Sequence, residues 1–352
     1  MIDFRQNHPS RFAFALAMCF VAGSLTAPSQ KPSPSHRLPQ EQPKQVITYP
    51  DVSRVPAKPE KGFLSPYFLF IPAPLQNSHG RAHLSLLVMP NNTGKVSDDP
   101  AVHETAALRK ANDWRRLATK LNDGLLVPAF PRPIDHDHLA KEDNIYTHSL
   151  SRTALLTTIP EIRRVDLQLI HMIDDARAEQ RHHGLRFSKR VLMFGFSASG
   201  MFTNRFVFLH PDRVQAAAFG SPGGWAIAPV SSWKGSPLPY PVGVADFKAV
   251  TGKSFRLHAA AKVPQFLFMG TADENDAVPY SDSFDKQSKD LIFDLFGSTL
   301  MARWPFTVKI YGQYLPNVQM KLYPGAKHEV TKAMVQDCEA FFELHLSPLP
   351  VQ

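Results

Sequence analysis

The serine at position 197 has the sequence surroundings of an activated nucleophile. It lies in the segment GFSASG (195–200), directly after an apolar run typical of a strand and before a predicted helix. On such a sharp turn small residues must flank the serine, which is then pushed out at the end of the sheet. Ser199 stands where this motif usually has its second glycine, and serine is small enough for the turn to form. The alternative is an ordinary strand–helix turn with a capping serine.

A nucleophilic serine needs a base to remove its proton and a carboxylate to orient that base. On this strand–turn–helix arrangement the chain order is serine, then acid, then histidine. Asp273 and His328 each follow the end of a later apolar run, in that order. We therefore expect Ser197, Asp273 and His328 to act together, with Asp276 as the alternative acid.

Backbone amides near the serine are expected to stabilise the negative charge that develops on an attacked carbonyl. The N–H of Ala198 opens the predicted helix, where the helix dipole favours an anion. The second donor is expected from the loop 90–94, at Asn92 or Thr93. Trp225 follows another strand end and is a candidate wall of the substrate pocket, with a purely structural role as the alternative.

The segments that would position these residues alternate between strands and helices. Strands are predicted where turn formers bound apolar runs, and helices where apolar residues recur every three to four positions. The alternation predicts an α/β fold with a mostly parallel central sheet, helices on both faces and the chemistry at the carboxyl ends of the strands. The predicted strands are 66–72, 83–90, 124–130, 189–196, 215–221, 263–270 and 318–324, and the predicted helices include 107–121, 161–182, 198–210 and 330–345.

Residues 1–27 are predicted to be a signal peptide. Arg5 and Arg11 give a positive start, and an apolar stretch over 12–23 precedes small residues that suit cleavage. An uncleaved membrane anchor is the alternative, but the stretch is too short to span a bilayer comfortably. We therefore expect an exported protein, periplasmic or secreted, with no stable membrane span.

The remainder is predicted to form one catalytic domain behind a linker. Residues 28–61 are rich in Pro, Ser, Gln and Lys, a composition that buries too little apolar surface to fold. The catalytic domain is expected over 62–352, with 226–262 as a candidate cap insertion.

Composition narrows the classes of partner and cofactor. The formal net charge is +8, but the body has no arginine-rich helix or basic–aromatic repeat, so nucleic-acid binding is not expected. The two cysteines are Cys19 and Cys338, and loss of the signal peptide would leave no internal disulfide. The run Asp-His-Asp-His at 135–138 is expected to be solvated, so neither a metal nor a cofactor is expected. The oligomeric state stays open.

Three segments of the body resemble the catalytic segments of α/β-hydrolases: GFSASGMFTNRF, GTADENDAVPY and YPGAKHE. The chain is similar to secreted bacterial esterases such as polyhydroxybutyrate depolymerases and feruloyl esterases. This resemblance covers about 65–345 and implies an α/β-hydrolase fold with a Ser197, Asp273 and His328 triad that acts through an acyl-enzyme. The glycine-rich oxyanion loop usual in the family is missing from this sequence.

The function expected from these features is hydrolysis of a carboxylic ester, either a small molecule or a polyester. The alternatives are an extracellular polyester depolymerase, a serine peptidase and a non-catalytic binding protein on the same fold. Because the histidine base must be neutral to accept a proton, activity is expected to fall below about pH 6.5.

Overall fold

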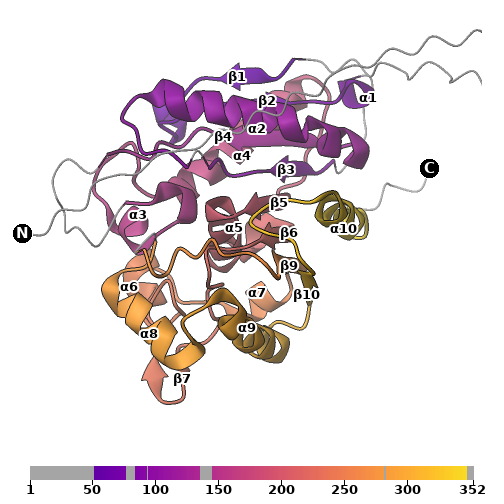
Figure 1. Ribbon diagram of the computed structural model, residues 1–352. Helices are drawn as coiled ribbons and strands as arrows, with labels where there is room; N and C mark the ends of the chain where they lie inside the picture. Colours follow the sequence, from indigo (N-terminus) through magenta and orange to yellow (C-terminus); the bar gives the residue numbers. More distant parts are fainter. Residues whose placement is uncertain (1–50, 77–83, 93, 135–144, 281–282, 347–352) are drawn as a thin grey trace, which may run out of the picture. The chain divides into compact units, whose positions relative to one another are not determined.

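The computed structural model describes residues 51–76, 84–92, 94–134, 145–280 and 283–346. Their centre is an eight-stranded sheet with the order β1-β2-β4-β3-β5-β6-β9-β10 (Figure 1). The strand β2 pairs antiparallel with β1 and β4, and all other neighbours are parallel. The mostly parallel sheet predicted from the sequence is therefore confirmed. The strands are β1 (Ser53–Val55), β2 (Tyr67–Phe70), β3 (Leu86–Val88), β4 (Gly124–Pro128), β5 (Val191–Phe196), β6 (Val214–Gly220), β9 (Gln265–Gly270) and β10 (Val318–Tyr323).

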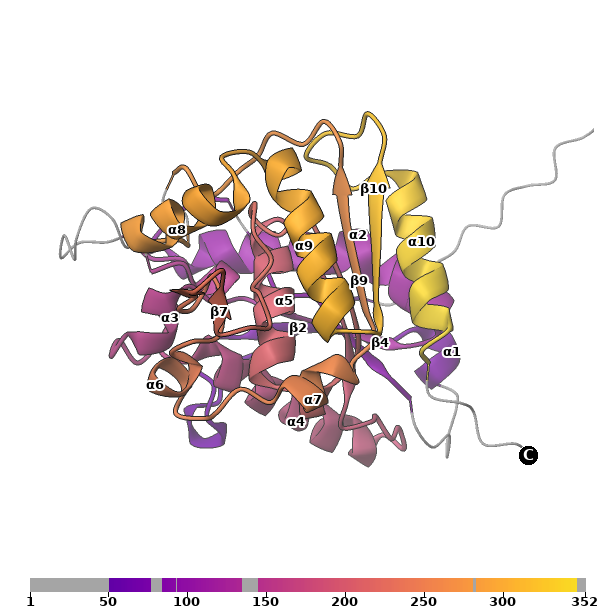
Figure 2. The same ribbon diagram turned by 90° about the horizontal axis from the view of Figure 1, so that it is seen from below.

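Helices cover both faces of the sheet because its strands are apolar on both sides. Successive side chains of a strand point to opposite faces, and in β5 Leu192 and Phe194 pack in one core cluster while Val191 and Met193 pack in another. The first cluster includes side chains of α2 (Pro100–Leu121) and α10 (Lys332–Glu343), and the second those of α4 (Val165–His182), α5 (Ala198–Leu209) and α9 (Leu300–Tyr314). Figure 2 shows α9 and α10 on opposite sides of β10.

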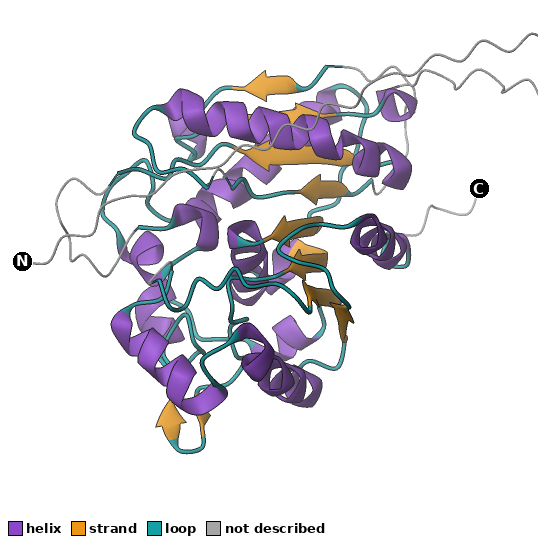
Figure 3. Ribbon diagram, in the orientation of Figure 1, coloured by secondary structure: helices purple, strands orange, loops and turns teal. Residues whose placement is uncertain are grey.

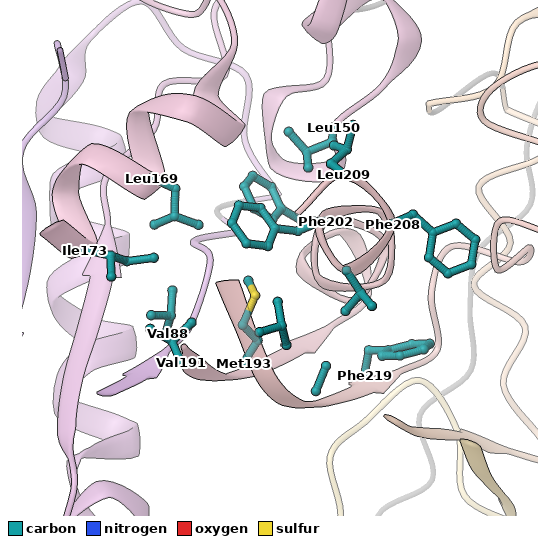
Figure 4. Close-up of a cluster of buried hydrophobic side chains, with 14 of the residues drawn as sticks. Val88, Leu150, Leu169, Ile173, Val191, Met193, Phe202, Phe208, Leu209 and Phe219 are labelled. Atoms are coloured by element: carbon teal, nitrogen blue, oxygen red, sulfur yellow. The ribbon is translucent and has the colours of Figure 1, made fainter. Parts of the chain in front are cut away.

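The core beside the α5 helix is dense in aromatic rings. Phe202 lies within it, and its ring stacks on that of Phe130 with centroids 6.2 Å apart and on that of Phe206 at 6.0 Å. Figure 4 shows Phe202 near Leu169 of α4 and Met193 of β5. These contacts fix α5 to the sheet, and α5 is the helix that begins directly after Ser197.

The remaining helices and strands are shorter than those of the sheet layers, and most of them occur in the carboxyl-terminal half of the sequence (Figure 3). Residues 226–262 form a small hairpin and two helices, and Leu238 and Val242 of this segment pack with Trp225 and Ile292. Whether the segment acts as a cap stays a prediction. The short elements are α1 (Ala73–Gln76), α3 (Arg152–Leu156), α6 (Phe247–Thr251), α7 (Leu257–Ala261), α8 (Lys286–Phe296), β7 (Ser232–Trp233), β8 (Ser236–Pro237) and the 3-10 helices η1 (Pro59–Lys61), η2 (Thr147–Ser149) and η3 (Pro211–Arg213).

The folded domain begins earlier than the sequence suggested. Residues 51–61 were predicted as part of a linker, and this is wrong because β1 pairs with β2 and forms the edge of the sheet. The amines of Lys58 and Lys61 lie 2.7 and 2.6 Å from the carboxylate of Asp175 on α4, whose side chain is almost fully buried. Charged and proline-rich composition does not exclude an edge strand, because edge strands are commonly short and carry charged residues and prolines. The predicted signal peptide and the rest of the linker lie outside the described residues.

Neither a membrane-spanning helix nor a disulfide is found in the described part of the chain. Within the described ranges, none of the helices has the length and apolarity required to cross a membrane. Cys338 is a free thiol buried in α10, and burial raises its pKa well above the ordinary value. It packs as a small apolar side chain in the core cluster that includes α2 and α10.

A buried ion pair ties the start of α4 to the end of α5. The side chain of Asp166 is fully buried and accepts hydrogen bonds from Arg164 Nε at 2.9 Å, from Arg164 Nη2 at 2.8 Å and from His210 Nε2 at 2.8 Å. Burial alone would raise the pKa of Asp166, but the bonds from Arg164 and His210 outweigh it and hold the pKa at about 2.

This pair predicts a specific acid sensitivity of the fold. Because the folded-state pKa of Asp166 lies below the unfolded value of about 3.9, its stabilisation is present above pH 4 and is lost as the pH falls from about 4 to 2, an effect of about 2–3 kcal/mol. The Asp166→Asn variant is expected to be less stable than wild type at pH 6, with the difference shrinking towards pH 2. Urea unfolding at several pH values measures it, and the exposed Asp294→Asn serves as control. A difference that does not change with pH would contradict the prediction.

Candidate active site

The turn between β5 and α5 is held in an unusual backbone conformation. Ser197 has φ 60° and ψ −128°, a region that non-glycine residues rarely occupy and that marks strained functional turns. Its N–H donates to the carbonyl of Gly220 at the end of β6, at 3.0 Å. A Cβ on Gly195 would come within 2.0 Å of the Ser199 carbonyl oxygen. Glycine is therefore required at position 195, two residues before Ser197, and the turn presents Ser197 at the carboxyl end of β5.

The predicted first oxyanion donor stands at the start of α5. Ala198 is the first residue of the helix, so its N–H has no acceptor within the helix, and the helix dipole adds partial positive charge there. Gly200, two residues after Ala198, lies so close to β6 that a Cβ would reach within 2.6 Å of the Gly220 carbonyl oxygen. The glycine after Ser199 thus serves close packing of helix against strand.

The structure brings Asp273 and His328 together. His328 Nδ1 lies 3.1 and 3.0 Å from the two carboxylate oxygens of Asp273. Asp273 follows β9, and His328 follows β10, so the parallel pairing of these strands places both loops at the same edge as Ser197. The His328 ring packs against Phe196, the residue before Ser197, with centroids 4.9 Å apart.

Asp273 is poised to stay ionised. Burial works to raise its pKa, but the hydrogen bond with His328 and the bond from the N–H of Asn275 hold the pKa below its ordinary value. An ionised carboxylate at Nδ1 fixes the ring tautomer and leaves Nε2 as the basic nitrogen. In the described part of the chain Ser197 Oγ makes no hydrogen bond to His328, and such contacts commonly tighten only when substrate binds.

The alternative acid, Asp276, has a different partner. Its carboxylate forms a buried ion pair with Arg303 of α9 and accepts the N–H of Val278 at 3.1 Å. Asp276 is thus engaged in joining the loop after β9 to α9. Of the two candidate carboxylates, only Asp273 contacts His328.

The loop after β3 is anchored by a residue that sequence reasoning missed. Asn91 is buried, and its side chain donates to the carbonyl of Phe130 at 2.9 Å and accepts the N–H of Phe130 at 3.2 Å. This fixes the base of the loop that carries Asn92, whose side-chain oxygen accepts the N–H of Gly94 at 3.3 Å. Thr93, the other predicted oxyanion donor, lies outside the described residues. The sequence signal for Asn91 was its place at the end of a strand.

The expectation that Trp225 walls the substrate pocket is not supported by its position. The residue is only 2% exposed. Its Nε1 donates to the carbonyl of Val242 at 2.9 Å, and its ring stacks on Phe296 with centroids 4.1 Å apart. Almost no surface of Trp225 is left for a substrate, so it acts as a core residue beneath the segment 226–262.

The described residues contain no cluster of three or more His, Cys, Asp or Glu side chains that could hold a metal ion. The Asp-His run at 135–138 lies outside the described residues.

Comparisons with known proteins identify the fold. No family model matches this chain, and no curated protein matches it either. Among solved structures it is similar to poly(aspartic acid) hydrolase-1 from Sphingomonas sp. KT-1, with a TM-score of 0.55 and 18% identity over 83% of this chain and 98% of that one. It is also similar to a poly(3-hydroxybutyrate) depolymerase from Bordetella parapertussis, with a TM-score of 0.50 and 16% identity over 85% and 91% of the two chains.

These likenesses, together with the sheet order and the turn at Ser197, define the class. The chain has the α/β-hydrolase fold, as its three segments that resemble those of α/β-hydrolases predicted. These two solved structures are a poly(aspartic acid) hydrolase and a poly(3-hydroxybutyrate) depolymerase, and each is named for the hydrolysis of a polymer. The resemblance to polyhydroxybutyrate depolymerases is thus confirmed at the level of the fold.

Proposed function

We propose that this protein is a serine hydrolase of carboxylic esters that acts through an acyl-enzyme on Ser197. The observation that carries the proposal is the strained turn at Ser197 beside the Asp273–His328 pair, with the His328 ring packed on the residue before the serine. A nucleophile, a base and an orienting acid at one sheet edge are the requirements of this reaction class.

The proposed reaction has two halves. His328 Nε2 takes the proton of Ser197 Oγ as it attacks the ester carbonyl, and Asp273 stabilises the resulting imidazolium through Nδ1–H. The amides of Ala198 and Asn92 bind the oxyanion of the tetrahedral intermediate. His328 then returns the proton to the leaving alcohol, and a water deprotonated by the same ring hydrolyses the acyl-enzyme. The second half frees the acid and restores Ser197.

A polyester is the second candidate substrate for the same site. The likeness to a poly(3-hydroxybutyrate) depolymerase favours it, and export of the enzyme, proposed from the amino-terminal sequence, would bring it to an extracellular polymer. Clearing of a polyester film, with release of soluble monomers, would distinguish a depolymerase from an esterase that acts only on small molecules.

Covalent labelling by a fluorophosphonate probe tests the proposal directly. The wild type is expected to be labelled, with the probe mapped by peptide mass to Ser197 rather than to Ser199, because only Ser197 lies on the strained turn. A panel of p-nitrophenyl esters from acetate to dodecanoate then measures the acyl preference. A protein that neither reacts with the probe nor hydrolyses any ester would support the non-catalytic alternative.

A further inference from the structure

One lysine joins the two segments that carry the expected oxyanion donors. Lys110 lies on α2, and its Nζ donates to the carbonyl of Pro90 at 2.6 Å and to Ser199 Oγ at 3.1 Å. Pro90 precedes Asn91 and Asn92 in the loop after β3. Ser199 lies in the first turn of α5, directly beyond Ser197.

The hydroxyl of Ser199 uses its full hydrogen-bonding capacity in this bridge. Ser199 Oγ donates to the carbonyl of Phe196 at 2.9 Å and accepts the Phe196 N–H at 3.1 Å, besides the bond from Lys110. A hydroxyl offers one donor and two acceptor sites, and all three are occupied. A glycine, the usual residue at this position of the motif, would leave the Lys110 amine without this acceptor. Ser199, which replaces the usual glycine of the motif, therefore has a specific hydrogen-bond partner in Lys110.

Lys110 occupies this position at a cost to stability. No carboxylate pairs with it among the residues that the structure describes, and burial lowers its pKa to about 7. Its charge is also one of the nearby positive charges that help to lower the pKa of His148 to about 3, although burial is the main cause. The side chain is partly buried, and an amine withdrawn from water with only neutral partners is unfavourable, so a side chain chosen for packing alone would be apolar.

We propose that Lys110 is a positioning residue that holds the turn at Ser197 and the loop after β3, which carries Asn92, at a fixed separation. The proposal rests on the proposed ester hydrolase function. The N–H groups of Ala198 and Asn92 come from these two segments, and they must both point at one oxyanion. Asn91 anchors the loop to Phe130 on its far side, and Lys110 anchors it to the nucleophile's own helix. Misplacement of catalytic groups by about 1 Å can cost up to about 100-fold in rate.

The Lys110→Met variant tests the bridge with a side chain of similar length that cannot donate. We expect kcat for p-nitrophenyl butyrate to fall about 10- to 100-fold, because the oxyanion donors act in the transition state, while KM stays within about 2-fold. The rate of fluorophosphonate labelling is expected to fall in parallel. Lys120→Met is the matched control, since Lys120 lies on the same helix, is exposed and pairs with Glu339. Its kcat and KM are expected to match wild type.

Variants of Ser199 test the same bridge from its other end. Ser199→Ala and Ser199→Gly are each expected to lower kcat about 10-fold with KM unchanged, although the glycine restores the usual motif. In the Lys110→Met background the Ser199→Ala change is expected to cost little more, because residues of one network are not additive. If Lys110→Met does not fold, the Ser199 variants decide the question.

The outcomes separate this inference from the proposed function. A wild type with no esterase activity contradicts both. An active wild type whose Lys110→Met and Ser199→Ala variants keep the wild-type kcat contradicts the bridge alone. Losses that appear only in KM or only in the melting temperature, or that add fully in the double variant, also overturn it.

Discussion

Replacing Ser197 by alanine is expected to lower kcat for p-nitrophenyl butyrate by about 10³-fold or more. The alanine removes the attacking oxygen and leaves the helix amide and the imidazole in place, so only direct attack by water remains. The fold should survive, because Ser197 makes its structural contact through its N–H, which donates to Gly220. Initial rates at saturating ester and the melting temperature measure the two effects separately.

Two control variants make the loss at position 197 specific. Ser254→Ala changes an exposed serine of the same chain and is expected to keep the wild-type rate. Ser199→Ala is expected to lower kcat only about 10-fold, far less than the loss expected for Ser197→Ala. A Ser197→Ala rate equal to wild type would refute the assignment of the nucleophile, and with it the acyl-enzyme.

Replacing Asp273 by asparagine is expected to lower kcat by about 10³- to 10⁴-fold, by analogy with the triad of serine proteases. The asparagine amide can donate to Nδ1 of His328, and this favours the tautomer whose Nε2 carries the hydrogen and cannot accept the proton of Ser197. KM for the ester is expected to change little, because Asp273 contacts the imidazole and not the substrate. Steady-state kinetics at pH 8 measure both constants.

Neighbouring carboxylates provide the controls for this second experiment. Glu274→Gln alters an exposed side chain next to Asp273 and should leave the rate unchanged. Asp276→Asn breaks the buried pair with Arg303, so it is expected to lower stability by about 3–5 kcal/mol while the folded fraction keeps most of its kcat. If Asp276→Asn abolished turnover and Asp273→Asn did not, the acid would be Asp276.

The main elements of the site follow from local sequence, since an apolar run followed by small or polar residues defines each strand end. Such runs located the turn at Ser197 and the loops of Asp273 and His328. The choice between Asp273 and Asp276 could not be made from sequence, because both lie in one loop. It depends on Arg303, which α9 brings to Asp276 from further along the chain.

Other features depend on contacts that no local pattern records. Trp225 follows a strand end like the candidate catalytic residues, but the segment 226–262 and Phe296 cover it. From the sequence alone, Lys110 is an ordinary polar residue of an amphipathic helix. Its proposed positioning role depends on the approach of α2 to Pro90 and Ser199. The strand β1 was missed for a related reason. Its pairing with β2 uses backbone hydrogen bonds, which leave no pattern in the side chains of such a short segment.

The two lysines that precede the predicted domain boundary have a practical consequence for recombinant production. Asp175 depends on Lys58, Lys61 and Tyr67 to hold its pKa below the ordinary value against burial. A shortened gene product that starts at Gly62 would delete both lysines together with the edge strand. It would leave a carboxylate in the interior with one phenol as its remaining partner and would expose the backbone of β2 to other chains. Expression should therefore start before residue 51, and a shorter product that precipitates would say nothing about the stability of the enzyme itself.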